Sequence, residues 1–541
     1  MKSFDWSNPY PSVRIPLLAR NVVATSQPLA AQAGLRMLLK GGTAVDAAIA
    51  AAAAITQVEP VSCGLGADAF AIVWHEGKAH GLNASGHSPQ AWSLEYFAQK
   101  YGRDASGRIK APMRGVDTVT IPGVVAGWVE LHKKFGRLPF AELMQPAIEL
   151  AERGYPVSPV VAHKWAAAIP EMKDLPGFAQ AFMPHARAPR IGERFRLQGA
   201  ARTLRLIGET YGQTMYQGEL AQAMVSFLQD NAGVHTLDDF ASFTPQWVEP
   251  LSMDYRGFTL HEIPPNGQGI AALMAVGILR NFDLSGMHPD SVTVQHLQIE
   301  AMKLAFADVY RYVSDPRTMP VSSQQLLDPD YLAERAKLID PGKAQYFGPG
   351  VPDAGGTIYL SAADESGMMI SFIQSNYKGF GSGIVVPGTG ISMQNRGTGF
   401  SMDPDSPNVV AGRKKPFHTI IPGFLSKQGK PVMSFGVMGG DIQPQGHLQT
   451  LVRMLDFDQQ PQAACCAPRW KVNRDFTIDV ESTMSPEVVA GLRALGHVMK
   501  SIEDPYMDFG SGQFIWRLSD DIEDGYVAAS DSRRDGQAVG F

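Results

Sequence analysis

The chain has 541 residues, of which 45% are hydrophobic and 18% are charged, a composition typical of globular proteins and not of disordered ones. Its formal net charge is -6, and no cluster of lysine and arginine interleaves with aromatic residues, which argues against nucleic acid as a partner. The three cysteines, Cys63, Cys465 and Cys466, exclude a disulfide framework and suit a reducing compartment.

The beginning of the chain and its most apolar run bear on location. The stretch from Met1 to Pro9 lacks a positively charged region followed by an apolar one, so we expect no secretory signal and a cytoplasmic protein. The run from Ala47 to Ile55 is bounded by Asp46 and Gln57, whereas a membrane span needs roughly 20 apolar residues. We therefore expect a buried helix there and no membrane partner.

The first 75 residues predict packed helices and strands. An alanine-rich helix is expected over Gln27–Leu39, because the glycine pair Gly41-Gly42 stops it and Thr43 is suited to begin a second helix. An apolar strand is expected over Ala69–Trp74.

The middle of the chain, from Phe140 to Leu338, carries several amphipathic patterns. The clearest runs from Val292 to Val313 and places Leu297 and Leu304 on one helical face. We therefore expect this region to be mainly helical.

The pattern then changes from helix to loop and strand. Glycine and proline between Leu338 and Gly356 predict a loop. Strands are expected over Thr357–Ser361 and Met369–Ile373, joined by a turn at Asp364–Gly367. A later helix is expected near Ser485–Leu495, so the whole chain predicts mixed sheets covered by helices.

Familiar catalytic motifs are missing from the sequence. There is no Gly-x-Ser-x-Gly, no His-Glu-x-x-His, no Cys-x-x-Cys and no glycine-rich nucleotide loop, so we expect neither metal nor cofactor. Thr357, which opens a strand directly after Gly355-Gly356, offers another chemistry. Cleavage between Gly356 and Thr357 exposes an α-amine beside the threonine hydroxyl, so that one residue supplies both base and nucleophile. A Gly-Gly-Thr before a strand is more commonly only a loop exit.

Blocks of sequence arranged in a fixed order resemble the γ-glutamyltransferase family. Near the candidate nucleophile they are Thr357, Asp364, Gly367, Phe380-Gly381-Ser382-Gly383, Pro387-Gly388-Thr389-Gly390-Ile391, Gln394-Asn395, Phe400, Lys415-Pro416 and Pro422. Elsewhere they include Gly41 to Ala48, Val58-Glu59-Pro60, Val119 to Gly123, Pro264-Pro265-Asn266-Gly267 and Asp531 to Gly536. The resemblance covers nearly the whole chain.

This resemblance implies an α+β fold of the N-terminal-nucleophile hydrolase type, with four αββα layers in which two antiparallel sheets lie between helices. It implies a proenzyme that cuts itself into a large fragment, residues 1–356, and a small fragment, residues 357–541, which form one intertwined unit. The catalytic residues implied are Thr357 as nucleophile, Ser375 as a hydroxyl bonded to it, and Gly439 and Gly440 as the oxyanion hole.

The sequence departs from the family at the substrate pocket. The family's Arg-Glu-Thr-Ala-Pro motif, whose arginine holds the α-carboxylate, reads Ser85-Gly86-His87-Ser88-Pro89, and its Asp-Asp-Phe motif reads Thr398-Gly399-Phe400. The resemblance nevertheless implies a rebuilt pocket, in which a new arginine is suited to bind a carboxylate. Its expected substrate-binding residues are Arg396, Tyr377, His418, Thr419 and Asp441.

The function that follows is an autocatalytically processed γ-glutamyltransferase-like amidohydrolase. Its expected partners are its own two fragments and a small-molecule substrate with an amide and an acid group, γ-glutamyl or glutathione-like. Oxamate or another short carboxylate monoamide is the alternative substrate, and a silent relative that binds a small acid is the alternative of another class. The sequence does not decide between hydrolysis and transpeptidation, nor whether the chain forms a homo-oligomer.

Overall fold

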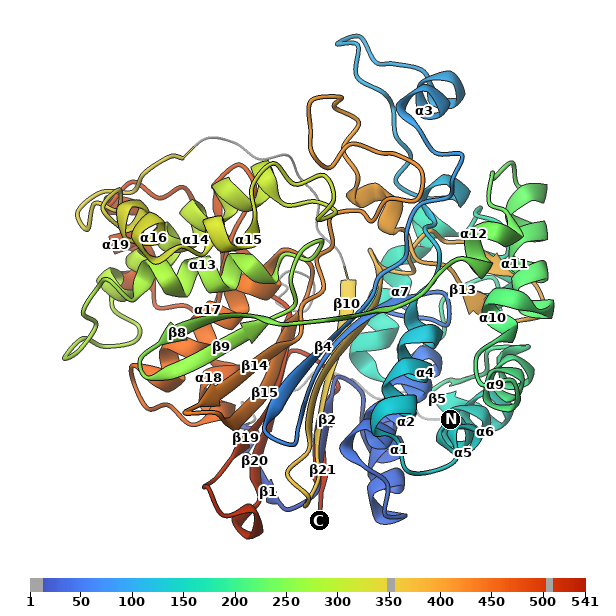
Figure 1. Ribbon diagram of the computed structural model, residues 1–541, viewed down its shortest axis with the longest axis horizontal. Coiled ribbons are helices and arrows are strands. Elements are labelled where there is room, and N and C mark those ends of the chain that lie inside the picture. The colour runs from blue at the N-terminus through green and yellow to red at the C-terminus, as the bar shows by residue number, and fades with distance from the viewer. Residues whose placement is uncertain (1–12, 348–355, 503–508) are drawn as a thin grey trace.

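The computed structural model describes residues 13–347, 356–502 and 509–541, and for Gly356 and Thr357 it describes the backbone alone. Two seven-stranded sheets lie face to face, and helices cover the outer face of each (Figure 1). All strand pairs within these two sheets are antiparallel. The predicted α+β fold with four αββα layers is therefore confirmed.

The first sheet has the order β1-β20-β19-β15-β14-β9-β8. Its strands are β1 (Leu17–Ala19), β20 (Tyr526–Ser530), β19 (Ser511–Arg517), β15 (Lys430–Met438), β14 (Gly423–Lys427), β9 (Phe258–Glu262) and β8 (Leu251–Tyr255). The second has the order β21-β2-β10-β11-β3-β4-β7. Its strands are β21 (Gln537–Gly540), β2 (Val22–Thr25), β10 (Gly356–Ala363), β11 (Met369–Tyr377), β3 (Asp68–His75), β4 (Lys78–Ala84) and β7 (Gln246–Val248).

Three small sheets lie outside these layers. They consist of β5 (Tyr155–Pro156) with β6 (Arg194–Phe195), β12 (Val385–Val386) with β13 (Ile391–Ser392), and β16 (Trp470–Val472) with β17 (Ile478–Glu481) and β18 (Met499–Ile502).

Helices α1 (Pro28–Leu39) and α2 (Ala44–Val58) pack on the second sheet. The side chain of Gln27 caps α1, and Thr43 begins α2 with a capping box that Asp46 completes. Every residue of α2 is buried, and its run of alanines lets neighbouring elements approach closely. The helices that follow α2 in the chain, up to strand β7, are α3 (Leu94–Tyr101), α4 (Val124–Phe135), α5 (Phe140–Leu143), α6 (Gln145–Arg153), α7 (Pro159–Met172), α8 (Phe178–Phe182), α9 (Ala200–Glu209), α10 (Thr214–Gln217), α11 (Glu219–Asp230) and α12 (Leu237–Ala241).

The first sheet is covered by a second helical layer, in which α13 (Gly269–Leu279) is buried along its whole length. The rest of this set comprises α14 (Val292–Tyr312), α15 (Ser323–Leu326), α16 (Pro329–Ala336), α17 (Ile442–Leu455), α18 (Pro461–Cys466) and α19 (Pro486–Ala494). A third apolar cluster lies between the two sheets and includes Phe70, Tyr359 and Phe424. The chain thus has an apolar core at each of its three layer interfaces.

Most of the elements predicted from the sequence are confirmed. The region expected to be mainly helical is so, although it also contains the strands β5, β6, β7, β8 and β9. The strand expected to begin at Thr357 begins at Gly356. Of the loop expected before it, residues 348–355 lie outside the described residues.

Two further sequence expectations concern the apolar run and the cysteines. The run Ala47–Ile55 is part of the buried helix α2, and no helix in the described ranges has the length and apolar character that crossing a bilayer requires. Cys63, Cys465 and Cys466 are all free thiols.

Candidate active site

Strand β10 carries the threonine predicted as nucleophile into the middle of a sheet, between β2 and β11 (Figure 1). Gly356 pairs with Tyr377 and Ile358 pairs with Gln374, so that the single residue Thr357 faces two residues of β11. Such bulges are frequent beside active sites, where they redirect a side chain. The backbone of Thr357 therefore lies at an irregular point inside the fold.

Two glycines, Gly439 and Gly440, join strand β15 to helix α17. Their φ angles of 125° and 73° lie in the region that favours glycine. A Cβ on Gly439 would lie 2.6 Å from Cγ2 of Ile442. The carbonyl of Gly440 accepts a hydrogen bond of 2.9 Å from Nε2 of Gln268. This turn depends on glycine and stands at the amino end of a helix, where the helix dipole favours negative charge.

The side chain of Arg396 is 1% exposed. Its Nη1 donates to Oγ1 of Thr419 at 2.9 Å, and its guanidinium lies 4.5 Å from the centre of the Tyr377 ring. Its Nε and Nη2 have no hydrogen-bond partner among the described residues. Burial lowers the pKa of Arg396 to about 10, against the attraction of Asp68, so the guanidinium is charged at neutral pH. The site thus contains a buried cation with two donor nitrogens that no described residue engages.

Tyr377 and Ser375 lie at the end of β11, beside the start of β10. The backbone N–H of Tyr377 donates to Oγ of Ser375 at 2.7 Å. Tyr377 has a φ of 78°, which is strained for a residue with a side chain. Both side chains are buried. The strained backbone directs the Tyr377 ring under the Arg396 guanidinium.

His418 and Asp68 form a buried pair, in which Nε2 of His418 lies 3.2 Å from Oδ2 of Asp68. Nδ1 of His418 accepts from the backbone N–H of Ile420 at 3.4 Å, so Nε2 carries the proton and donates to Asp68. Burial, together with Arg396, holds the pKa of His418 well below its ordinary value, so the ring is neutral. Both ring nitrogens are therefore already engaged within the protein.

Asp68 heads strand β3, and its Oδ1 accepts backbone N–H groups from Gly86 at 3.2 Å and Gly123 at 3.1 Å. Burial raises its pKa to about 7, although Arg396 opposes this shift. The charge on Asp68 consequently changes near neutral pH, beside the cation of the site.

Asp441 directly follows the two glycines and is paired with Arg474. Nε of Arg474 lies 3.1 Å from Oδ2 of Asp441, and Nη2 lies 3.4 Å from Oδ1. The Arg474 guanidinium also lies 4.5 Å from the centre of the Tyr310 ring. Through Arg474, Asp441, the first residue after the glycine turn, is therefore held near Tyr310 of the neighbouring helix α14.

The structure brings the residues predicted from the sequence into one region. Arg396 contacts Tyr377 and Thr419 directly, and Gln268 connects Thr419 to Gly440 by donating to both of their carbonyls. The side chain of Thr357 lies outside the described residues, so its bonds to the others stay a prediction. The sequence reasoning missed Asp68, Gln268 and Arg474. Gln268 directly follows the Pro264 to Gly267 block, which was an available signal.

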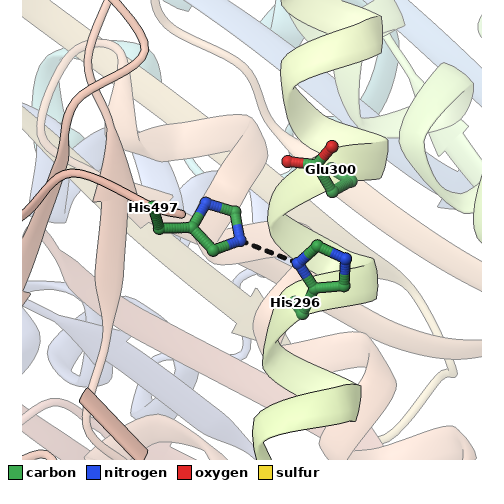
Figure 2. Close-up of side chains that lie close together, drawn as sticks. All are labelled: His296, Glu300 and His497. Atoms are coloured by element: carbon green, nitrogen blue, oxygen red, sulfur yellow. Dashed lines mark hydrogen bonds between the residues drawn. The ribbon is translucent and has the colours of Figure 1, made fainter. Parts of the chain in front are cut away.

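The described residues offer one grouping of metal-type ligands, His296, Glu300 and His497, whose ligand atoms lie within 4.8 Å of one another. It belongs to α14 and to the turn after α19, and none of its members is among the residues that surround β10 (Figure 2).

Comparison with known proteins gives full-length matches. A family model described as gamma-glutamyltranspeptidase matches residues 30–541. The chain is 35% identical over 533 residues to the glutathione hydrolase-like YwrD proenzyme of Bacillus subtilis (strain 168), covering 96% of this chain and 98% of that protein. It is 35% identical over 525 residues to the oxamate amidohydrolase proenzyme of Klebsiella pneumoniae subsp. pneumoniae, covering 95% and 97%.

Solved structures agree with these matches. A crystal structure of cephalosporin acylase from Bacillus halodurans has a TM-score of 0.94 and 47% sequence identity, covering 100% of this chain and 99% of that one. The predicted family resemblance and the predicted enzyme class are therefore confirmed. The chain belongs to the γ-glutamyltranspeptidase family.

Proposed function

We propose that the chain is a proenzyme that cuts itself before Thr357 and then hydrolyses an amide whose acyl part carries a carboxylate. The observation that carries the substrate proposal is the buried guanidinium of Arg396, with Nε and Nη2 unpartnered among the described residues. A charged donor pair of this kind matches the two oxygens of a carboxylate.

Self-cleavage begins when the Thr357 hydroxyl attacks the carbonyl carbon of Gly356. The C–N bond breaks as the new C–O ester forms, and the proton lost by the hydroxyl ends on the leaving amine. Water then hydrolyses the ester and leaves a carboxyl on Gly356 and a free α-amine on Thr357. The bulge at Thr357 and the absence of a Cβ on Gly356 support this step.

In each turnover the freed amine takes the hydroxyl proton, and the oxygen attacks the substrate amide. Negative charge develops on the carbonyl oxygen, where we assign the backbone amides of Gly439 and Gly440 as donors. The substrate amine leaves with a proton and an acyl-Thr357 ester remains. Water hydrolyses this ester and restores the hydroxyl. Ser375, buried beside the start of β10, is assigned the hydroxyl that orients Thr357.

Arg396 is assigned to the substrate carboxylate, with Tyr377 beneath its guanidinium and Thr419 holding Nη1. His418 is assigned a positioning role, because its ring is bonded to Asp68 and to the backbone of Ile420. In this proposal Arg396 replaces the family arginine that is missing at the stretch Ser85–Pro89.

Asp441 was expected to bind substrate, and we now assign it a positioning role. Its carboxylate is paired with Arg474, so we propose that the pair fixes the glycine turn and that Asp441 shapes the edge of the pocket.

The relatives suggest which amides to test. Two are named for glutathione hydrolase-like and oxamate amidohydrolase activities, and the full-length structural relative is named a cephalosporin acylase. A small-acid amide is our leading substrate, either γ-glutamyl or a short monoamide such as oxamate. A cephalosporin amide is the second candidate, favoured by the 47% identity over the whole chain. Residence in the cytoplasm is also a proposal, supported by three cysteines in the thiol form.

Denaturing electrophoresis tests the maturation step. The purified protein is expected to give two fragments, with the sequence of the smaller one beginning at Thr357. Thr357→Ala is expected to remain one chain and to have no turnover. A wild-type chain that stays whole on incubation, or a Thr357→Ala variant that keeps full turnover, would remove Thr357 from the mechanism.

A substrate screen tests the pocket. The matured enzyme is given γ-glutamyl amides, oxamate and a cephalosporin amide, each beside an analogue in which the acid is replaced by a neutral group, and release of the amine is measured. We expect turnover only where the acid is present. Equal rates on acid and neutral analogues would contradict the role of Arg396, and no turnover on any amide would favour a silent small-acid-binding relative.

A further inference from the structure

A second buried polar cluster lies away from the residues around β10. His296 and Glu300 of helix α14 lie close to His497, which reaches them from the turn after α19 (Figure 2). Lys303 stands one turn after Glu300 on α14 and is bonded to it. Each of the four is at most 4% exposed. Nζ of Lys303 lies 2.8 Å from Oε1 of Glu300, which neutralises the carboxylate. None of its members has a role in the amide hydrolysis proposed above.

The cluster has metal-type ligands, but all of their ligand atoms are in use. The two oxygens of Glu300 accept from Lys303 and from the backbone N–H of Gln345. The four ring nitrogens of His296 and His497 bond to each other, to Lys303 and to the carbonyl of Asp340. A metal ion would have to displace the ammonium of Lys303, which already supplies the positive charge. The geometry is that of a closed hydrogen-bond network and not of a metal site.

The direction of these hydrogen bonds follows from Lys303, which can only donate. It donates to Nδ1 of His497 at 3.2 Å, so the proton of His497 is on Nε2. That proton goes to Nδ1 of His296 at 2.8 Å, and Nε2–H of His296 donates to the carbonyl of Asp340 at 2.8 Å. Burial, together with Lys303, lowers the pKa of His497 to about 3, which agrees with a neutral His497 ring. A single arrangement of protons therefore satisfies the hydrogen bonds of all four side chains.

The network ends on the chain segment 340–347, which leads toward Gly356. Apart from one bridge between Asp340 and Lys343, this segment belongs to no helix or strand. Its backbone is held instead by side chains, since Gln345 donates to Glu300 at 2.9 Å and accepts from Lys303 at 3.1 Å. The backbone N–H of Ala344 also donates to the carbonyl of Leu495 at 2.7 Å.

We propose that His296, Glu300, Lys303 and His497 form a clasp that positions segment 340–347 for self-cleavage and retains it on the protein afterwards. The proposal rests on the proposed cut before Thr357, which would make this segment part of the tail of the large fragment. His497 and Leu495 would then belong to the small fragment, so the clasp would join the two fragments. The four side chains are positioning residues for maturation and do not touch the substrate.

The test replaces the ion pair by apolar groups in Glu300→Leu/Lys303→Leu, because removing both partners avoids leaving a buried charge. Hydrogen exchange is measured on peptides covering residues 340–347, and the appearance of the small fragment is timed on gels. We expect roughly ten- to a hundredfold faster exchange in this segment, the effect of losing a hydrogen bond to a charged group. We also expect slower self-cleavage, with kcat of the matured enzyme unchanged.

The chain supplies a matched control in Glu334 and Lys337, which form the same ion pair at the same spacing but are exposed. Glu334→Ala/Lys337→Ala lies just before the segment and is expected to match the wild type in both measurements. If the first double variant fails to fold, His296→Leu/His497→Leu removes the bond to Asp340 without unpairing a charge.

Exchange in residues 340–347 that equals the wild type in a folded clasp variant overturns the clasp, and so does self-cleavage at the wild-type rate. Tight binding of Zn²⁺ by the wild type, lost in His296→Leu/His497→Leu, would also overturn it in favour of a metal site. If no protein is cut, the wild type included, then the proposed function at Thr357 fails, and the exchange measurement alone decides whether the clasp holds the segment.

Discussion

Among the described residues, Nε and Nη2 of Arg396 have no hydrogen-bond partner, which is unusual, because buried donors in proteins nearly always have one. A buried cation is tolerated when an opposite charge lies nearby, and Asp68 supplies part of that charge. The Tyr377 ring lies beneath the Arg396 guanidinium, and Thr419 holds its Nη1. The edge that carries Nε and Nη2 is left for a ligand. A substrate carboxylate would complete the set of hydrogen bonds.

Arg396→Gln is expected to lower kcat/KM for an acid-bearing amide roughly thirty- to several-thousand-fold, corresponding to the loss of about 2–5 kcal/mol when one partner of a buried charge pair is removed. Steady-state kinetics of the matured variant measure this. Arg396→Lys keeps the charge but not the paired donors. Its kcat/KM is expected to lie between those of the wild type and Arg396→Gln. An equal loss on a neutral analogue would show that Arg396 is structural.

Asp68 predicts a pH effect on stability. Its pKa is raised from 3.8 to about 7, so between these values the folded chain keeps a proton that the unfolded chain has released. Stability contributed by this group is therefore present below about pH 4 and is lost as the pH rises through about 7. In a Thr357→Ala background, Asp68→Asn is expected to remove this fall. Thermal unfolding of the two proteins from pH 4 to 8 measures the difference, and parallel curves would contradict the prediction.

At this scale the site could be predicted from the sequence only in part. Arg396, Tyr377 and Thr419 could be named because they stand beside blocks that resemble the family and differ from it at those positions. Asp68 and Arg474 could not, because their roles depend on contacts with His418 and Asp441, which lie far away in the sequence. Nothing in the local pattern around Arg474 signals that its charge lies beside the glycine turn.

Among the elements, the turn between β15 and α17 matters most for chemistry, since it places two glycine amides at a helix amino end. Its conformation is fixed by positive φ angles and by the contact between Gln268 and the Gly440 carbonyl. The proposed reaction is therefore expected to be sensitive to small changes in this backbone.

Gly439→Ala is expected to lower kcat about a hundred- to a thousandfold, the usual effect of losing one oxyanion donor, because its Cβ would meet Ile442 and the Cα of Gly510. Gly429→Ala is the matched control, since Gly429 also has a positive φ, at 75°, stands at the opposite end of β15 and has open space around its Cβ. Single-turnover rates measure the effect. A similar loss in both variants would assign it to backbone strain alone.

The elements themselves were predictable where they end in strong local signals. The stop at Gly41-Gly42, the helix start at Thr43 and the turn at Asp364–Gly367 are examples, and the helices and the hairpin that they predict are present. Strands β7, β8 and β9 were not predicted, because they are short and pair partly with strands distant in sequence. β9, for example, is bonded to β14, which lies more than 150 residues later.

Across the whole molecule, the two proposed fragments are interleaved. In the second sheet β10 and β11 lie between β2 and β3, and in the first sheet β14 lies beside β9. After cleavage, separating the fragments would require breaking both sheets and opening the apolar cluster between them.

The matured protein is accordingly expected to elute from a sizing column with both fragments in one peak, and to separate only in denaturant. Mass spectrometry of the peak checks the pairing, and uncut Thr357→Ala provides the size standard. Fragments that part in native buffer would show that the sheets open after maturation.

The backbone of Phe541, which directly follows β21, is hydrogen-bonded in both directions to Asn21, which directly precedes β2, while Thr357 lies on the interior strand β10. A gene rearranged to start at Thr357, with a linker from Phe541 to Val13, the first of the described residues, is therefore expected to leave strands β1 and β2 in place. Once its initiator methionine is removed, such a chain would carry the free α-amine of Thr357 without any self-cleavage. Scission of the peptide bond before Thr357 would then be dispensable, and in the proposed reaction its role would be only to free that amine.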